Sequence, residues 1–176
     1  MKNLLIIVDM QKAFINENTK GIDDKIQNFI EKSGIKDVVA TRYINHENTA
    51  CYRFEGWKEC MEGTEETEVS SILKPYIKRE FLKDKYSCWN DEMKKFISDN
   101  GYDMIYFAGV NTGCCVLHSV YDCYNDVVEC RVIEDLCGST SGHELHREAI
   151  DVIKSCITDG RVISSDDAAV EISKTI

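Results

Sequence analysis

Two cysteines stand side by side at positions 114 and 115, inside the stretch AGVNTGCCVLHS (residues 108–119). An apolar run at residues 104–108 precedes them and predicts a buried strand. If Thr112 caps the helix that follows, Cys115 is its third residue, where free N–H groups and the helix dipole favour a reactive thiolate. Cys114 shares that turn, and a free cysteine is more often a small buried hydrophobe than a nucleophile. The pair therefore offers a candidate nucleophile, but helix position does not decide between the two thiols.

Two further reactive side chains follow predicted strands. Asp9 comes directly after the apolar run at residues 4–8, and Lys83 ends the run at residues 77–83. Taken singly, Asp9 is more simply a solvated end-of-strand acid and Lys83 a surface lysine. However, the carboxyl ends of parallel strands meet at one edge of a sheet, where ligands bind in open α/β folds. We therefore expect a carboxylate, an ammonium group and a thiol to converge on one pocket.

Apolar runs alternate with helical patterns along the whole chain. Strands are predicted at residues 4–8, 38–41, 77–83, 104–108, 127–133 and 161–163, with Asp135 at the end of the fifth. Helical patterns lie around residues 26–30, 66–73, 91–101 and 112–124, and a Ser141-x-x-Glu144 capping box opens a last helix. Asn90 is a suitable N-cap for the third of these helices, and Gly101 closes it. The alternation predicts an α/β, Rossmann-like, three-layer domain over residues 1–176, with a mostly parallel sheet of about six strands and helices on both faces.

Composition narrows the class of protein. The 176 residues carry a formal net charge of −10, which disfavours a nucleic-acid partner and an anionic membrane surface. The apolar run near the N-terminus is too short for a signal segment or a membrane span. Nine cysteines without any CxxC pair indicate reduced thiols rather than a zinc ribbon or a thioredoxin-type site. We expect a cytoplasmic protein that binds neither nucleic acid nor membrane.

Three short motifs resemble those of the isochorismatase-like cysteine hydrolases. They are VDMQKAF (residues 8–14), KDKYS (residues 83–87) and GVNTGCCV (residues 109–116). The superfamily includes nicotinamidases, N-carbamoylsarcosine amidases and ureidoacrylate hydrolases. Its motif positions D-x-Q-x-x-F, a lysine four residues before a serine, and G-V-x-T-x-x-C-V are met by Asp9, Gln11, Phe14, Lys83, Ser87, Gly109, Val110, Thr112, Cys115 and Val116. The resemblance covers essentially the whole chain, including Asp135 and His146.

The resemblance implies a catalytic triad and a fold of the isochorismatase-like type. The family's nucleophile is the cysteine before the valine, which corresponds to Cys115, with Asp9 as general base and Lys83 beside both. It also implies an oxyanion hole formed by the backbone N–H groups of Asn111 and Cys115, with a cis peptide bond between Val110 and Asn111. The implied reaction is hydrolysis through a thioester, and the implied assembly is a homo-oligomer, either a dimer or larger.

One departure from the family pattern concerns metal. Nicotinamidases hold a metal ion with the aspartate and histidine of T-x-D-x-H, whereas this chain reads Thr-Arg-Tyr-Ile-Asn at residues 41–45. Tyr43 and Asn45 replace the two ligands, and His46 is one position away. We therefore predict no catalytic metal and no cofactor, and nicotinamidase activity is disfavoured. Members that cleave the vinyl ether of isochorismate need no cysteine nucleophile, so Cys115 favours C–N hydrolysis of an amide, ureido or carbamoyl compound.

The expected substrate is a small molecule, and an arginine and several aromatic residues are candidates for the lining of its pocket. The candidate lining residues are Phe14, Arg42, Trp57, Tyr86, Trp89 and Tyr121, and an arginine would suit a substrate carboxylate. The acidic segment at residues 55–66 is expected to be a solvated loop or a lid. Three alternatives stay open: an isochorismatase-type hydrolase of another small substrate, a thiol redox or binding protein, and a nucleotide-binding Rossmann module. The last lacks a G-x-G-x-x-G after the first strand.

Overall fold

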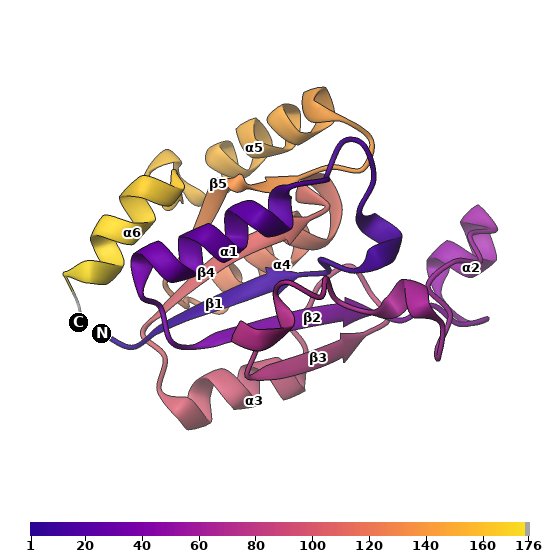
Figure 1. Cartoon of the computed structure of the whole chain (residues 1–176), viewed down its shortest axis with the longest axis horizontal. Coiled ribbons are helices and arrows are strands. Elements are labelled where there is room, and N and C mark those ends of the chain that lie inside the picture. Colours follow the sequence, from indigo (N-terminus) through magenta and orange to yellow (C-terminus); the bar gives the residue numbers. More distant parts are fainter. Residues whose placement is uncertain (175–176) are drawn as a thin grey trace.

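The computed structural model describes residues 1–174, and its centre is one sheet of six parallel strands in the order β3-β2-β1-β4-β5-β6 (Figure 1). The strands are β1 (Asn3–Val8), β2 (Val38–Tyr43), β3 (Arg79–Lys83), β4 (Met104–Val110), β5 (Cys130–Gly138) and β6 (Val162–Ile163). β1 and β4 are buried along nearly their whole length, as their unbroken apolar sequences predict. The expected α/β fold with about six strands is confirmed.

Helices cover both faces of the sheet. They are α1 (Ile22–Ser33), α2 (Ala50–Glu55), α3 (Asp91–Asn100), α4 (Leu117–Asn125), α5 (His143–Ile157) and α6 (Ser165–Ser173). Alternate residues of β1 enter two separate cores, because successive side chains of a strand point to opposite faces. One core packs against α3, α4 and α5, and the other against α1 and α6. The short helix α2 lies apart from both, beyond the end of β2 (Figure 1).

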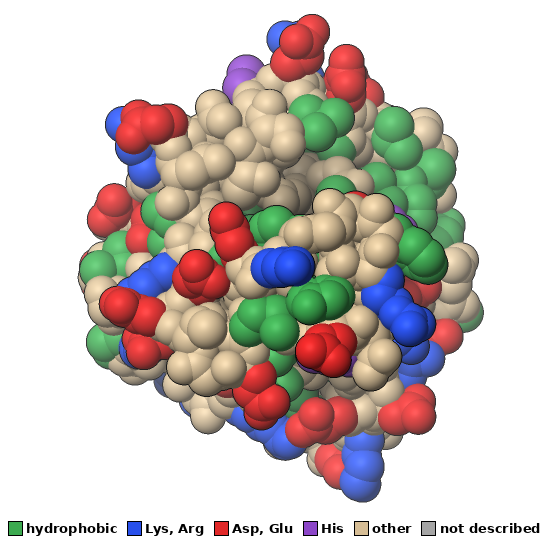
Figure 2. Space-filling view, turned by 90° about the vertical axis from the view of Figure 1, so that its right-hand side faces the viewer, with side chains coloured by type: hydrophobic (Ala, Val, Ile, Leu, Met, Phe, Trp, Pro, Cys, Tyr) green, Lys and Arg blue, Asp and Glu red, His purple; other side chains and the backbone are tan. Residues whose placement is uncertain are grey.

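Figure 2 looks onto the edge at which the strands end, where hydrophobic and acidic side chains, with a basic side chain among them, lie close together near a hollow. Parallel strands bring the residues after β1, β3 and β4 to this edge. Gly109 has a φ of 113° near the end of β4, and a Cβ atom there would lie 2.2 Å from the Val8 carbonyl oxygen. Only glycine allows that approach between β1 and β4, which brings the segment after β4 close to Asp9.

Several predicted helix starts differ from the observed ones. Asn90 caps α3 as expected, since its side chain accepts a hydrogen bond from the Met93 N–H. Thr112 caps no helix: residues 112–116 form one π-helical turn, and the Thr112 hydroxyl donates to the Gly138 carbonyl oxygen at 2.9 Å. The capping box at Ser141 is also wrong, because α5 begins at His143 after a glycine that offers no side chain.

The helix predicted over residues 66–73 is absent. A 3₁₀ turn, Glu65–Thr67, occupies its start, and an isolated antiparallel bridge between Val69 and Gln11 then holds the chain extended. The short helices α2 and α6 were not predicted, since neither has a long apolar periodicity. Within residues 1–174, no helix combines the length and the apolar character that crossing a membrane requires.

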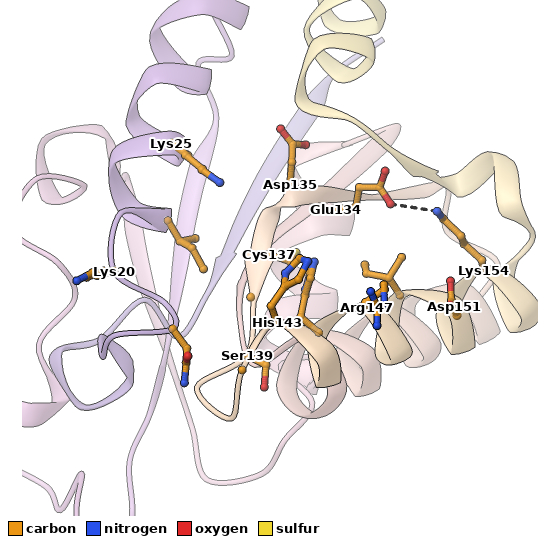
Figure 3. A pocket seen from close by; sticks show the side chains of 16 residues that line it. Lys20, Lys25, Glu134, Asp135, Cys137, Ser139, His143, Arg147, Asp151 and Lys154 are labelled. Carbon is orange, nitrogen blue, oxygen red and sulfur yellow. Dashed lines mark hydrogen bonds and ion pairs between the residues drawn. The ribbon is translucent and has the colours of Figure 1, made fainter.

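The sequence predicts Asp135 at the end of its strand, but the structure places it within β5. β5 continues to Gly138, and the Asp135 carboxylate accepts hydrogen bonds from the backbone N–H and the hydroxyl of Ser165 at the start of α6. Asp135 instead borders a cavity of about 500 Å³ between α1 and α5, together with Lys25, His143 and Arg147 (Figure 3). That cavity does not include the two adjacent cysteines.

Candidate active site

The first part of the site is a buried ion pair. Asp9 follows β1 with a φ of 48°, and its Oδ2 atom lies 2.6 Å from the Nζ atom of Lys83 at the end of β3. Both side chains are at most 2% exposed, so the two charges are shielded from water. Burial is the largest single influence and lowers the pKa of Lys83, but the charge and hydrogen bond of Asp9, together with the nearby Cys115 and Cys88 thiols, raise this pKa above its usual value. Lys83 therefore stays protonated and Asp9 has a cation beside it.

A threonine orients the Asp9 carboxylate. The hydroxyl of Thr41, on β2, donates to Asp9 Oδ1 at 2.6 Å and accepts from the Asp9 N–H at 3.1 Å. One buried hydroxyl thus satisfies both the side chain and the backbone of Asp9. Thr41 is the first residue of the stretch 41–45 that corresponds to the metal-ligand motif T-x-D-x-H. The sequence does not predict its hydrogen bond to Asp9.

We expect Thr41→Val to lower the free energy of unfolding by about 1–3 kcal/mol, because it leaves the buried Asp9 N–H without its acceptor. Thr41→Ser keeps the hydroxyl and should cost less. Urea denaturation of both variants measures the difference. Equal stability of the valine variant and the wild type would show that this hydroxyl is not needed to hold Asp9.

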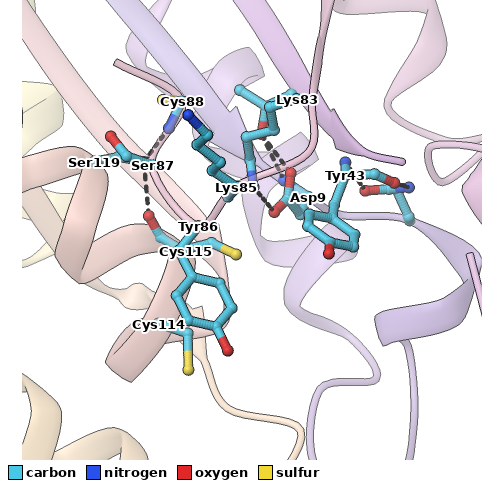
Figure 4. A network of polar contacts seen from close by, with 12 residues as sticks. Asp9, Tyr43, Lys83, Lys85, Tyr86, Ser87, Cys88, Cys114, Cys115 and Ser119 are labelled. Carbon is cyan, nitrogen blue, oxygen red and sulfur yellow. Dashed lines mark hydrogen bonds and ion pairs between the residues drawn. The ribbon is translucent and has the colours of Figure 1, made fainter. Parts of the chain in front are cut away.

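The two adjacent cysteines point in different directions. Figure 4 shows the Cys115 side chain directed toward the Asp9–Lys83 pair, whereas that of Cys114 lies beside Tyr86. Cys115 is 7% exposed, and Cys114 is half-buried. The π-helical turn after β4 separates the two directions. The side chain near the two charged residues is therefore that of Cys115 and not that of Cys114.

The Cys115 thiol is protonated at rest. Burial is the largest influence and raises the pKa of Cys115 well above its usual range; the negative charge of Asp9 adds to this, and Lys83 opposes it. A helix start that lowers the thiol pKa was expected from the sequence, and the net direction is the opposite. Such a thiol needs a base at the moment of attack, and the Asp9 carboxylate is the neighbouring group that can accept its proton.

Hydrogen bonds hold the backbone around Cys115. The Cys115 carbonyl oxygen accepts from the Ser119 hydroxyl at 2.6 Å, and Ser119 accepts from the Cys88 N–H at 2.9 Å. These bonds tie α4 to the segment after β3. The Val110–Asn111 peptide bond is cis, and the Asn111 side-chain oxygen accepts from the Thr140 N–H at 2.7 Å. The turn that carries Cys115 is therefore fixed from both sides.

A cavity of about 330 Å³ opens beside the thiol. Its lining residues are Ala13, Phe14, Asn16, Tyr43, Cys51, Glu55, Trp57, Glu59, Tyr86, Asn111, Cys114, Cys115 and Thr140. Of the residues expected from the sequence, Phe14, Trp57 and Tyr86 line it together with Asn111 and Cys115. Cys51 and Glu55 come from α2, and Trp57 and Glu59 follow it, so α2 and the residues just after it form one wall of the cavity.

The other three expected pocket residues lie elsewhere, and this corrects the sequence interpretation. Arg42 forms an ion pair with Glu80 at 3.0 Å and is not among the lining residues. The Trp89 indole donates to the Asp126 carboxylate at 2.8 Å and lines a different pocket, beside α3. The Tyr121 hydroxyl donates to the Val152 carbonyl oxygen on α5. Arg42 in particular is already paired and is not available to bind a substrate carboxylate.

The residues at the family's metal-ligand positions do not suit a metal. The Asn45 side-chain amide donates to the carbonyl oxygens of Trp57 and Glu59, at 2.8 and 3.0 Å. Tyr43 packs against Trp57 with ring centroids 6.0 Å apart. Within residues 1–174, no group of three or more histidine, cysteine, aspartate or glutamate residues is placed to hold a metal ion. No step of the chemistry is therefore assigned to one.

Gln11 has a structural role that the motif alone did not reveal. Its side-chain nitrogen donates to the carbonyl oxygens of Tyr43 and Thr67, both at 3.0 Å, and its side-chain oxygen accepts from the Tyr43 N–H at 2.7 Å. The residue is fully buried. Gln11 thus fixes the end of β2 to the segment after β1, which places Tyr43 in the cavity wall.

A family model described as the isochorismatase domain matches residues 3–167. An isochorismatase-like hydrolase from Alkaliphilus metalliredigens has a TM-score of 0.83 at 18% identity, covering 96% of this chain and 97% of that one. Nicotinamidase from Bacillus subtilis has a TM-score of 0.78 at 23% identity, with 93% and 99% covered. N-carbamoylsarcosine amidase from Thermoplasma acidophilum has a TM-score of 0.76 at 22% identity, with 94% and 98% covered. These structures share the fold, and none of the curated proteins compared matches the sequence.

Proposed function

This chain belongs to the isochorismatase family, and we propose that it is a cysteine hydrolase that cleaves a C–N bond of a small amide, ureido or carbamoyl compound. The observation that carries the proposal is the meeting of Asp9, Lys83 and Cys115 at one edge of the sheet, beside a cavity of about 330 Å³. A thiol, a neighbouring carboxylate and a fixed cation can supply the nucleophile, the proton acceptor and the charge stabilisation for amide hydrolysis through a thioester.

In the proposed reaction, Asp9 accepts the thiol proton as Cys115 Sγ attacks the carbonyl carbon of the substrate. The resulting oxyanion accepts hydrogen bonds from the backbone N–H groups of Asn111 and Cys115. The C–N bond breaks, and Asp9 returns the proton to the leaving nitrogen, which departs as ammonia or an amine. Water then attacks the thioester while Asp9 accepts a proton from it. The C–S bond breaks, Asp9 returns this proton to Cys115 Sγ, and the product acid leaves.

Lys83 keeps its proton throughout this cycle. Its ammonium group stabilises the Asp9 carboxylate at rest, at 2.6 Å, and stabilises the thiolate character that develops during attack. The ion pair is thus part of the chemistry and not only of the fold.

We take residues 1–176 as one hydrolase domain, and we propose a cytoplasmic homo-oligomer that acts without a cofactor.

An ammonia-release screen over primary amides, ureido acids and carbamoyl compounds tests the proposed activity. Intact-mass spectrometry of quenched reactions provides a second readout, because an acyl group on Cys115 adds the mass of the substrate less its leaving group. Turnover together with this adduct supports the proposal. Oxidation of Cys114 or Cys115 by peroxide, without turnover of any compound in the screen, would favour a thiol redox protein instead.

We expect turnover to survive exhaustive chelation. Asn45 and Tyr43, at the positions of the family's metal ligands, are committed to hydrogen bonding and packing. The assay is steady-state turnover before and after treatment with 1,10-phenanthroline and dialysis, with metal content measured in parallel. Loss of turnover that returns on adding zinc or iron would overturn the metal-free mechanism.

A further inference from the structure

The cavity beside Cys115 is negatively charged. Glu55, the last residue of α2, and Glu59 both line it, and none of its lining residues is a lysine or an arginine. Within residues 1–174, neither carboxylate forms an ion pair. Glu55 accepts a hydrogen bond from the Tyr86 hydroxyl at 3.4 Å, which holds its carboxylate at the cavity wall.

Three lysines near this wall, Lys58, Lys83 and Lys85, have other surroundings or partners than the two carboxylates. Lys58 lies over the ring of Tyr52, 5.8 Å from its centroid. Lys85 borders a neighbouring pocket, which it shares with Asp84. The lysine beside the nucleophile, Lys83, is already neutralised by Asp9. Neither of the two carboxylates thus has a lysine or an arginine as an ion-pair partner among the residues that the structure describes.

Four aromatic residues, Phe14, Tyr43, Trp57 and Tyr86, also line the cavity. Phe14 stacks on Trp57 with ring centroids 5.9 Å apart, and Tyr43 lies 6.0 Å from Trp57 on another side. Tyr86 adds a fourth ring to the lining. Aromatic faces attract cations, and rings combined with carboxylates are the usual means of binding an ammonium group. A substrate carboxylate would instead meet two like charges.

We infer that the substrate carries a positively charged group, such as a protonated amine or a pyridinium ring, alongside its scissile C–N bond. Glu55, Glu59 and the aromatic wall bind this group, while the carbonyl carbon lies at Cys115. The inference rests on the proposed hydrolase function and specifies its substrate class. The net charge of −10 also favours the approach of a cation over long range.

Two sets of matched probes test the inference. The aliphatic set is 4-aminobutanamide (cation), pentanamide (neutral) and succinamate (anion). The aromatic set is 1-methylnicotinamide (cation), nicotinamide (neutral) and 3-carbamoylbenzoate (anion). In at least one set, kcat/KM should be highest for the cation, by about tenfold over the neutral member, and lowest for the anion.

Substitutions of the two carboxylates provide the structural control. Glu55→Gln and Glu59→Gln should each lower the ratio of kcat/KM for the cation to that for the neutral probe, and the double variant should remove most of the preference. Glu62→Gln makes the same charge change at an exposed position of the same loop, outside the cavity lining, and should leave the ratio as in the wild type. Thermal melts of the variants confirm that each is folded.

Binding to the Cys115→Ala variant separates failure of this inference from failure of the hydrolase proposal. Calorimetric titration with the same probes should also rank the cation first. If the wild type turns over no probe but this variant binds cations preferentially, C–N hydrolysis is the proposal in error. If the variant binds the three charge types equally, favours the anion or binds none of them, the cationic substrate class is wrong, whatever the ammonia-release screen finds.

Discussion

Cys115→Ala should reduce hydrolysis by on the order of 10⁴-fold or more, whereas Cys114→Ala should keep most of the activity. The reason is the direction of the two side chains: the Cys115 thiol faces the Asp9 carboxylate, its proposed proton acceptor, and the Cys114 thiol lies beside Tyr86. Removing the nucleophile leaves only substrate binding and the oxyanion hole. Removing Cys114 changes one half-buried wall of the cavity.

Steady-state kinetics of the two alanine variants measure this difference, and circular dichroism establishes that both are folded. Mass spectrometry should detect the acyl adduct in Cys114→Ala and not in Cys115→Ala. Similar losses in two folded variants would overturn the assignment of the nucleophile. Acylation of Cys114 in the wild type would do so more directly.

Two independent signals in the sequence lead to the expectation that Asp9, Lys83 and Cys115 lie at one edge of the sheet. Unbroken apolar runs identified the parallel strands, and reactive residues followed β1, β3 and β4. Parallel topology alone then requires Asp9, Lys83 and Cys115 to share one edge. The distance of 2.6 Å between Asp9 and Lys83 follows from side-chain packing, which the apolar pattern does not describe.

What the sequence did not predict depends on tertiary contacts. Thr41 looked like an ordinary strand residue until the structure brought its hydroxyl to Asp9. Arg42 was expected to bind a substrate carboxylate, but it forms an ion pair with Glu80 on the neighbouring strand. The segment after β4 was predicted as an α-helix capped by Thr112, yet the Gly138 carbonyl oxygen receives that hydroxyl instead. In each case a partner far along the chain competes with a local rule.

Asp9→Asn and Lys83→Met should each lower kcat/KM by about 10³-fold or more, and the double variant should lose little beyond either single one. In the proposed mechanism the three residues act in one step, so a second substitution removes no function that the first has left intact. Each single variant also leaves a buried charge without its partner, which should lower the free energy of unfolding by about 3–5 kcal/mol. The double variant removes both charges and should be more stable than either single variant, which identifies the pair by a measurement independent of turnover.

Alkylation of Cys115 distinguishes the roles of the two residues, because they act on the thiol pKa with opposite signs. The negative charge of Asp9 raises this pKa and the positive charge of Lys83 lowers it. Asp9→Asn should therefore shift the pH profile of iodoacetamide labelling to lower pH, and Lys83→Met should shift it to higher pH. Peptide mass spectrometry resolves Cys115 from the other thiols, with the exposed Cys156 as the internal reference. Shifts in the same direction, or an unchanged profile in Lys83→Met, would mean that Lys83 does not act on the nucleophile, and the triad would have to be abandoned.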